Sequence, residues 1–96
     1  MSFADQVKAF QVKAKGKTEE QIQFFCFTLL TNLVMGTPVD TGCARGNWQA
    51  SINAPVTATT ERKDKNGRRT IKEEEPQTKL AAGNIFWITN NKSEGQ

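Results

Sequence analysis

The residues of this 96-residue chain that could do chemistry lie in the stretch from Thr37 to Trp48. Asp40 stands between Pro38 and Gly42, in a run too rich in turn-forming residues to continue a helix. A carboxylate in such a turn could act as a catalytic group. The alternative is that the carboxylate binds the backbone and performs no chemistry.

The same stretch can be interpreted as a corner that joins a helix to a sheet. Pro38 fixes φ at the second position of a turn and ends a helix that arrives before it. Asp40 and Thr41 can bond backbone amides two or three residues ahead, as an Asx-turn or a helix cap. We favour this structural interpretation, in which the corner consists of Thr37, Pro38, Asp40, Thr41, Gly42, Arg45 and Trp48.

The composition excludes several kinds of catalytic site. The chain has no histidine, which rules out Ser–His and Cys–His catalysis. Its two cysteines, Cys26 and Cys43, lack the spacing of metal ligands, so we expect no metal site and no cofactor. A disulfide between them is not expected in a reducing cytosol. We expect Cys26 in the core and Cys43 near the corner.

Charge and hydropathy limit the partners. The net charge of +3 would permit weak contact with nucleic acid or an acidic protein surface, but it indicates neither. No run approaches the roughly 18 apolar residues of a membrane span, so no membrane partner is expected. The first residues lack the basic and then apolar order of a signal peptide, which predicts synthesis in the cytosol.

The elements around the corner predict a single α+β domain over residues 1–96. One long helix is expected over about 19–35, because Thr18 and Gln21 form a capping-box pattern before a helical apolar stripe. A short N-terminal helix is expected before Gly16. Both would pack on a small, mainly antiparallel sheet that includes strands near 48–53 and 84–89.

The long helix carries more apolar surface than one face can bury. Phe24 and Phe27 lie outside the main stripe, and either the opening helix or another protein chain must cover them. We therefore expect these two phenylalanines at an interface.

Residues 61–80 differ in composition from the rest of the chain. They contain almost nothing apolar to bury, which favours a flexible charged loop over a protruding hairpin with its tip at Asn66 and Gly67. The positive residues that could face DNA in this loop are Arg62, Lys63, Arg68 and Arg69. Because acidic neighbours nearly cancel their charge, a nucleic-acid-binding module remains an alternative only. Residues 92–96 are predicted to be a polar tail.

Residues 39–44, Val-Asp-Thr-Gly-Cys-Ala, resemble the active-site motif of retroviral-type aspartic proteases. This resemblance implies one subunit of a dimeric protease with Asp40 as the catalytic carboxylate. Two features depart from that family: a long helix, instead of a strand, precedes the motif, and the second family element, an apolar run into Gly-Arg-Asn or Gly-Arg-Asp, is missing. The protease is kept as an alternative.

A longer match consists of two motifs in order. Residues 37–42, Thr-Pro-Val-Asp-Thr-Gly, are followed by Arg-Gly-Asn-Trp at 45–48, and residues 85–91 read Ile-Phe-Trp-Ile-Thr-Asn-Asn. Together they resemble the neck or tail-completion family of minor virion proteins of tailed phages, which includes relatives of the lambda minor tail protein Z. The resemblance spans roughly Thr18 to Asn91.

The resemblance implies a structural virion protein at the neck or tail end. Such proteins form a ring of copies, contact other neck and tail proteins, and help a finished tail join a filled head. They are made in the cytoplasm of the host bacterium, and charged loops in the ring would meet passing genomic DNA without reading its sequence. In this account Asp40, Thr41 and Arg45 hold the corner, Trp48 anchors it, and the chain is no enzyme.

The match has one departure at its end. Relatives continue from the Asn-Asn pair into Pro-Tyr-Ala and further structure, whereas this chain passes from Asn91 to Lys92 and the polar tail. This indicates either a truncated protein or residues missing between the two.

Overall fold

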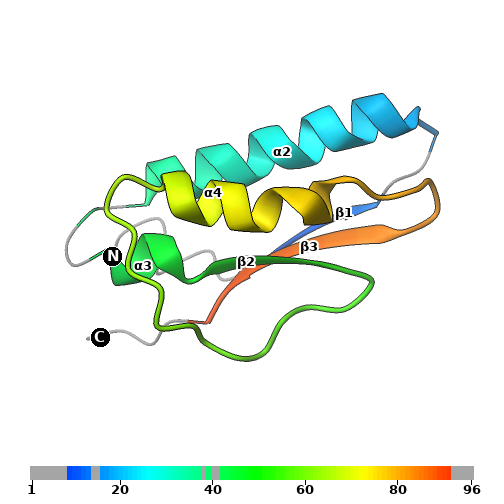
Figure 1. Cartoon of the computed structure of the whole chain (residues 1–96). Coiled ribbons are helices and arrows are strands. Elements are labelled where there is room, and N and C mark those ends of the chain that lie inside the picture. Colours follow the sequence, from blue (N-terminus) through cyan, green and yellow to red (C-terminus); the bar gives the residue numbers. More distant parts are fainter. Residues whose placement is uncertain (1–8, 14–15, 38, 40–41, 92–96) are drawn as a thin grey trace.

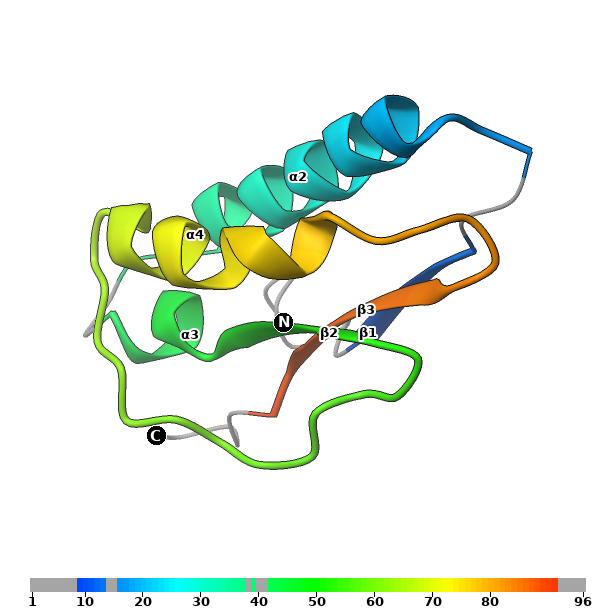
Figure 2. The same cartoon turned by 45° about the vertical axis from the view of Figure 1, so that its right-hand side comes forward.

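The computed structural model of the chain describes residues 9–13, 16–37, 39 and 42–91. A three-stranded antiparallel sheet forms one layer, and two helices, α2 and α4, lie over one of its faces (Figure 1 and Figure 2). The elements in chain order are β1 (Ala9–Lys13), α2 (Glu19–Gly36), α3 (Cys43–Gly46), β2 (Trp48–Ile52), α4 (Arg68–Glu74), the 3-10 helix η1 (Glu75–Thr78) and β3 (Ile85–Asn90). The predicted α+β class is confirmed.

Helix α2 begins and ends as the sequence predicts. The Thr18 hydroxyl accepts a hydrogen bond from the Gln21 amide at 3.2 Å, and the Gln21 side chain accepts one from the Thr18 amide at 3.1 Å. This capping box satisfies two amides that have no partner within the helix. The face of α2 that packs on the sheet buries Ile22, Cys26, Leu30, Leu33 and Val34.

The sheet has the order β1-β3-β2, with both contacts antiparallel. The last strand along the chain, β3, is therefore the central one, in agreement with its run of apolar residues. Phe86 and Ile88 are fully buried, and they lie opposite Ile52 and Ala50 of β2. The two strands predicted near 48–53 and 84–89 are confirmed.

The prediction of a short N-terminal helix is wrong for the part that the structure describes. Residues 9–13 form strand β1, in which Val12 lies opposite Phe86 and Lys13 opposite Ile85. The sequence alternates here between apolar and polar residues, a pattern of period two that suits a strand. Pairing with β3, more than 70 residues away, decides the outcome. Residues 1–8 lie outside the described part.

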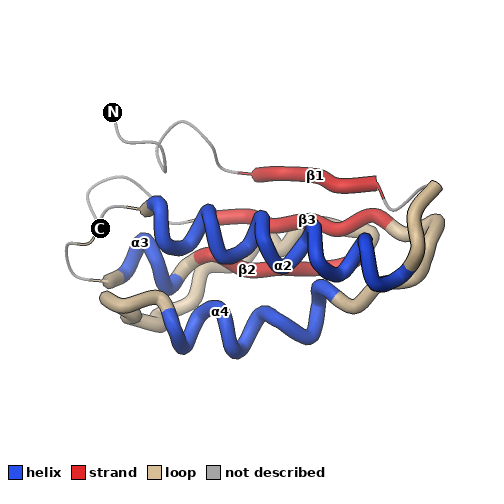
Figure 3. The backbone as a smooth tube through the Cα atoms, turned by 90° about the horizontal axis from the view of Figure 1, so that it is seen from above, coloured by secondary structure: helices blue, strands red, loops and turns tan. Residues whose placement is uncertain are grey.

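The prediction of a flexible loop or hairpin over residues 61–80 is also wrong. The segment contains α4 and η1, which lie beside α2 and against β2 (Figure 3). Thr70, Thr78 and Leu80 are buried there, and Ile71 packs on the core. Few apolar residues were available to signal this packing, because much of the buried surface is polar.

The connection from β2 to α4 returns along the sheet face that the helices leave open (Figure 1). The Thr89 hydroxyl donates to the Val56 carbonyl at 3.3 Å, and the Asn91 side chain donates to the same carbonyl at 2.7 Å. The Gln49 side chain donates to the Ala58 carbonyl at 2.8 Å. Polar side chains therefore fix this connection to β2 and β3. The predicted polar tail at 92–96 lies outside the described residues.

Candidate functional site: the corner after the long helix

The corner between α2 and β2 is organised around the hydroxyl of Thr37. This hydroxyl donates to the Leu33 carbonyl at 2.6 Å and accepts the indole N–H of Trp48 at 2.7 Å. Thr37 is 1% exposed and Trp48 is 0% exposed, so both bonds are shielded from water. They tie the last turn of α2 to the first residue of β2.

Arg45 completes the end of α2 from outside the helix. Its guanidinium donates to the carbonyls of Met35 at 3.1 Å, Thr37 at 2.9 Å and Lys65 at 2.7 Å. The last turn of α2 contains no basic residue. Arg45 therefore supplies the positive charge that favours the carboxyl end of a helix dipole, and it satisfies carbonyls that have no helical partner.

Two glycines let backbone segments meet at the corner. Gly42 has φ +87°, and its carbonyl accepts hydrogen bonds from the amides of Gly46 at 2.9 Å and Asp64 at 3.0 Å. A Cβ atom on Gly42 would lie 2.8 Å from the Asp64 nitrogen, and one on Gly46 would lie 2.0 Å from the Arg62 carbonyl oxygen. No larger residue fits at Gly46 unless the 62–65 segment moves away.

Three of the predicted corner residues lie outside the described part of the chain. They are Pro38, Asp40 and Thr41. The proposed role of Asp40, whether as a backbone bracket or as a catalytic carboxylate, therefore stays a prediction. Of the other predicted corner residues, the structure brings Thr37, Arg45 and Trp48 to the end of α2, and it places Gly42 against residues 64 and 65.

The sequence did not reveal the role of Arg62, which links the corner to α4. Its side chain is 6% exposed and donates to the carbonyls of Gly46 at 2.8 Å and Trp48 at 2.7 Å. The same guanidinium contacts the carboxylates of Glu73 and Glu74, each at 3.1 Å. The prediction that Arg62 faces DNA is wrong, because all four bonds hold it inside the protein.

The remaining basic residues predicted to face DNA are on the surface. Lys63 and Arg68 are exposed. The Arg69 side chain is 63% exposed and lies 2.6 Å from the Glu73 carboxylate, one helical turn along α4. Only part of the predicted basic patch therefore remains free, which weakens the nucleic-acid-binding alternative.

Asp64 begins α4. Its carboxylate accepts the Thr70 amide at 2.6 Å, and its carbonyl accepts the Gly67 amide at 3.3 Å. Burial alone would raise the pKa of Asp64. The hydrogen bonds from Thr70, the Gly67 amide and the positive charge of Arg62 outweigh burial, so the pKa is lowered from its ordinary value.

This shift predicts a loss of stability in acid. Because the folded protein holds Asp64 at a pKa below that of the unfolded chain, the stabilising effect is complete above the unfolded pKa of about 4. It disappears as the pH falls through the lower folded pKa. We expect Asp64→Asn to be less stable than the parent chain at neutral pH, and the two free energies of unfolding to converge in acid. Urea titrations at several pH values measure this, and a constant difference down to pH 2 would contradict it.

The hydrogen bonds of Thr37 give a second prediction. Thr37→Val keeps the shape of the side chain but leaves the buried Trp48 indole N–H without an acceptor, which should lower the free energy of unfolding by about 1–3 kcal/mol. Urea unfolding followed by tryptophan fluorescence measures the effect. Thr28→Val is the control, because Thr28 is an exposed threonine of the same helix and should change stability by less than about 0.5 kcal/mol. Equal effects of the two substitutions would contradict the assigned bond.

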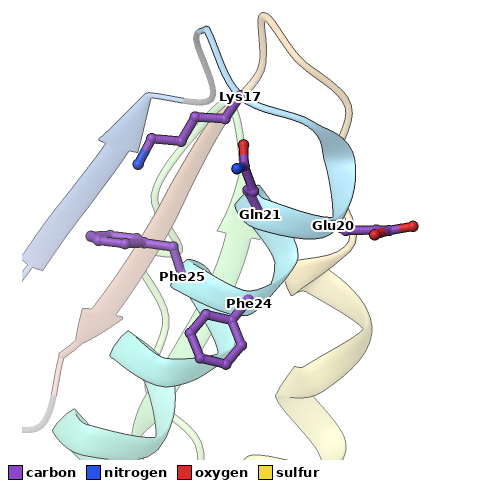
Figure 4. A pocket seen from close by; sticks show the side chains of 5 residues that line it. All are labelled: Lys17, Glu20, Gln21, Phe24 and Phe25. Atoms are coloured by element: carbon purple, nitrogen blue, oxygen red, sulfur yellow. The ribbon is translucent and has the colours of Figure 1, made fainter.

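The outer surface of α2 carries the residues expected at an interface. Phe24 is 74% exposed, whereas Phe27 is half-buried. The sequence did not single out Phe25, which is 48% exposed and has the Lys17 ammonium 5.2 Å from its ring centroid. Phe24 and Phe25 line an open hollow near the start of α2 together with Lys17, Glu20 and Gln21 (Figure 4).

In the described part of the chain, Cys26 and Cys43 are not joined by a disulfide bond. Cys26 is buried in the core, and burial raises the pKa of its thiol to about 11. Cys43 is half-buried at the start of α3. Cys26 is therefore an uncharged core residue at neutral pH.

The corner as described binds backbone groups with side chains, and its charged groups are engaged in hydrogen bonds. In residues 9–13, 16–37, 39 and 42–91, no group of three or more His, Cys, Asp or Glu side chains is placed to hold a metal ion. In the same residues, no helix has the length and apolar content to cross a bilayer. Comparison of the chain with models of protein families, with curated proteins and with solved structures gives no significant match.

Proposed function

We propose that this chain is a structural, non-enzymatic subunit of a tailed-phage virion, and that it acts at the neck or tail end in tail completion and head–tail joining. The observation that carries the proposal is the arrangement of the corner. Arg45 and Trp48, which belong to the first motif of the family resemblance, bind the end of α2 and the Thr37 hydroxyl. Motif residues that hold backbone in this way suit a structural role.

A ring-like homo-oligomer is the form of assembly that we propose. Copies in a ring contact each other through two different patches. The exposed large apolar residues of the described chain form two pairs: Phe24 with Phe25 near the start of α2, and Met35 with Val39 at and beyond its end. We propose that the first pair of one copy packs against the second pair of the next.

A ring at the neck or tail end would have other virion proteins and the genomic DNA as further partners. Other neck and tail proteins would lie above and below the ring, in a virion assembled in the cytoplasm of the host bacterium. Contact with passing DNA would be made through phosphates without sequence preference. Since Arg62 is buried and Arg69 is paired with Glu73, Lys63 and Arg68 are the predicted residues that remain for this contact.

Complementation between two variants tests the proposed assembly. Phe24→Ser disrupts the first patch and Met35→Ser the second, and because Phe24 is 74% and Met35 46% exposed, neither change should unfold the chain. Electron microscopy should show rings for the parent chain and none for either variant. An equal mixture of the variants should form heterodimers, since each still carries the patch that the other lacks. The absence of rings from the purified parent chain, or of heterodimers from the mixture, would overturn the proposed assembly.

The protease alternative has its own test. The purified chain is incubated with unfolded protein substrates at acidic and neutral pH, and its Asp40→Asn variant serves as the control. We expect no cleavage by either protein. Cleavage by the parent chain that Asp40→Asn abolishes would replace the structural proposal with an aspartic protease.

A further inference from the structure

The two outer edges of the sheet differ. Along β2, the Arg62 guanidinium donates to the Trp48 carbonyl at 2.7 Å, and the Glu74 carboxylate accepts the Ala50 amide at 2.7 Å. These side chains occupy backbone groups that would otherwise bind another strand. The Arg62 and Glu74 side chains therefore block the addition of a strand along β2 at Trp48 and Ala50.

The alternation of backbone groups shows which groups of β3 face each neighbour. Successive residues of a strand point their N–H and C=O groups to opposite edges. The backbone N–H of Ala50 points away from β3, because it donates to the Glu74 carboxylate. The backbone groups of the next residue, Ser51, therefore point toward β3, where Ser51 lies opposite Trp87. The neighbours of Trp87 in β3, Phe86 and Ile88, consequently point toward β1.

The same alternation continues into β1. Val12 lies opposite Phe86 and Phe10 opposite Ile88, so these two residues of β1 use their backbone groups on β3. In the described chain, the structure records no hydrogen bond to residues 9–13 apart from this pairing. The residues whose N–H and C=O groups point to the open edge are Ala9, Gln11 and Lys13.

The helix layer is also open above this edge. Seen from above, α4 lies on the β2 side of α2, and no described helix lies above β1 (Figure 3). Phe25 projects from the flank of α2 that faces β1 (Figure 4). The Phe25 side chain is 48% exposed. In contrast, the apolar side chains of Val12 in β1 and Leu29 in α2 pack against the core. A strand added beside β1 would place apolar surface next to this ring.

We propose that β1 is a self-association edge, at which the β1 strands of two copies pair antiparallel around a twofold axis through Gln11. The backbone of Gln11 in one copy would exchange both hydrogen bonds with Gln11 of the other. In this register Lys13 lies opposite Ala9, so the two lysines do not face each other. Each β1 is thus complementary to itself in hydrogen bonding, and this register places no two charged side chains of residues 9–13 opposite each other.

The strand that we expect beside β1 belongs to a second copy of this chain, because the blocked β2 edge limits how copies can pair. A sheet that grows head-to-tail needs two open edges, and this sheet has one. Edge pairing can therefore only be isologous, and it ends at two copies. The two β3 strands would lie about 14 Å apart, three strand spacings, with a Phe25 ring from each side above the new pair. This contact differs from the ring contact on α2 and does not depend on the proposed function.

Paired charge variants test the axis. Gln11→Lys and Gln11→Glu each place like charges opposite one another across the proposed axis, whereas a mixture places opposite charges there. The variants are made in the full chain carrying Phe24→Ser, so that assembly through α2 does not hide the effect. Native mass spectrometry should show few homodimers of either variant and at least a several-fold excess of the heterodimer. The matched pair Lys13→Glu and parent Lys13 should show no such preference, because residue 13 faces Ala9.

Hydrogen exchange gives the second readout. The outward Gln11 amide should gain protection as the protein concentration rises, whereas the Val12 amide, which is directed at β3, should be protected at every concentration. A random mixture of homodimers and heterodimers, or a Gln11 amide that exchanges at the same rate at all concentrations, would overturn the proposal. A larger charge effect at position 13 than at position 11 would overturn the proposed register. Neither result would bear on whether the parent chain forms rings through α2.

Discussion

Gly46→Ala is expected to lower the free energy of unfolding by about 3 kcal/mol or more. The new methyl carbon would lie 2.0 Å from the Arg62 carbonyl oxygen and 2.7 Å from the carbonyl carbon. Both atoms belong to backbone, so no side-chain rotation can make room. The 62–65 segment would have to move, which would also displace the Arg62 guanidinium from the carbonyls of Gly46 and Trp48. Urea unfolding followed by circular dichroism measures the loss.

Gly36→Ala is the matched control. Gly36 is the last residue of α2, and nothing lies within 4 Å of the position of its new Cβ. Alanine has the higher helix propensity, so this variant should be as stable as the parent or up to about 1 kcal/mol more stable. A Gly46→Ala variant as stable as Gly36→Ala would show that the backbone contact is absent.

Arg62→Met is expected to lower the free energy of unfolding by about 3–5 kcal/mol. Methionine retains much of the apolar length of the side chain, but it donates nothing to the two carbonyls that Arg62 binds. The change also leaves the Glu74 carboxylate, whose side chain is 16% exposed, without its cation. Breaking a buried pair from one side costs more than the pair itself contributes, because the remaining charge is desolvated.

Two variants of α4 serve as controls for Arg62→Met. Arg68 is exposed, and Arg69 makes an ion pair at the surface. Arg68→Met and Arg69→Met should each change the free energy of unfolding by less than about 1 kcal/mol. Arg62→Lys should recover only part of the stability, because an ammonium group cannot reproduce the planar set of donors. If all three arginines behaved alike, Arg62 would not be the buried link described above.

The sequence predicted best the elements with strong local signals. The capping box and apolar stripe defined α2 almost to the residue, and alternation defined β2. Strand β1 was misassigned because five residues carry little local preference, and a distant strand supplies the hydrogen bonds that decide their conformation. Its alternating pattern was the available signal.

The prediction for residues 61–80, which contain α4, was wrong for a different reason. A run of charges usually forms a solvated surface, but here Arg62 and Asp64 are buried through hydrogen bonds with backbone and carboxylates. Apolar content therefore underestimated the order of this segment. The pairing of Arg69 with Glu73 at helical spacing was a local sign of α4.

The candidate site was predicted in part. Thr37, Arg45 and Trp48 were named from the corner motif, and the structure joins them at the end of α2. Arg62 could not be connected to the same corner, because its contacts with Gly46 and Trp48 span 14 to 16 residues and depend on the path of the β2–α4 connection. Contacts of this kind leave no periodic pattern in a sequence.

The position of β3 has a consequence for how the chain is made. Both β1 and β2 depend on a strand that follows them in the chain, so a growing polypeptide exposes two unpaired strands and the apolar side of α2 until β3 has been synthesised. Such a nascent chain invites aggregation, and its long-range pairing slows folding. A chain that ends just before Ile85 should therefore be bound by chaperones and degraded by proteases, whereas a chain that continues through β3 to Asn90 and beyond should escape both.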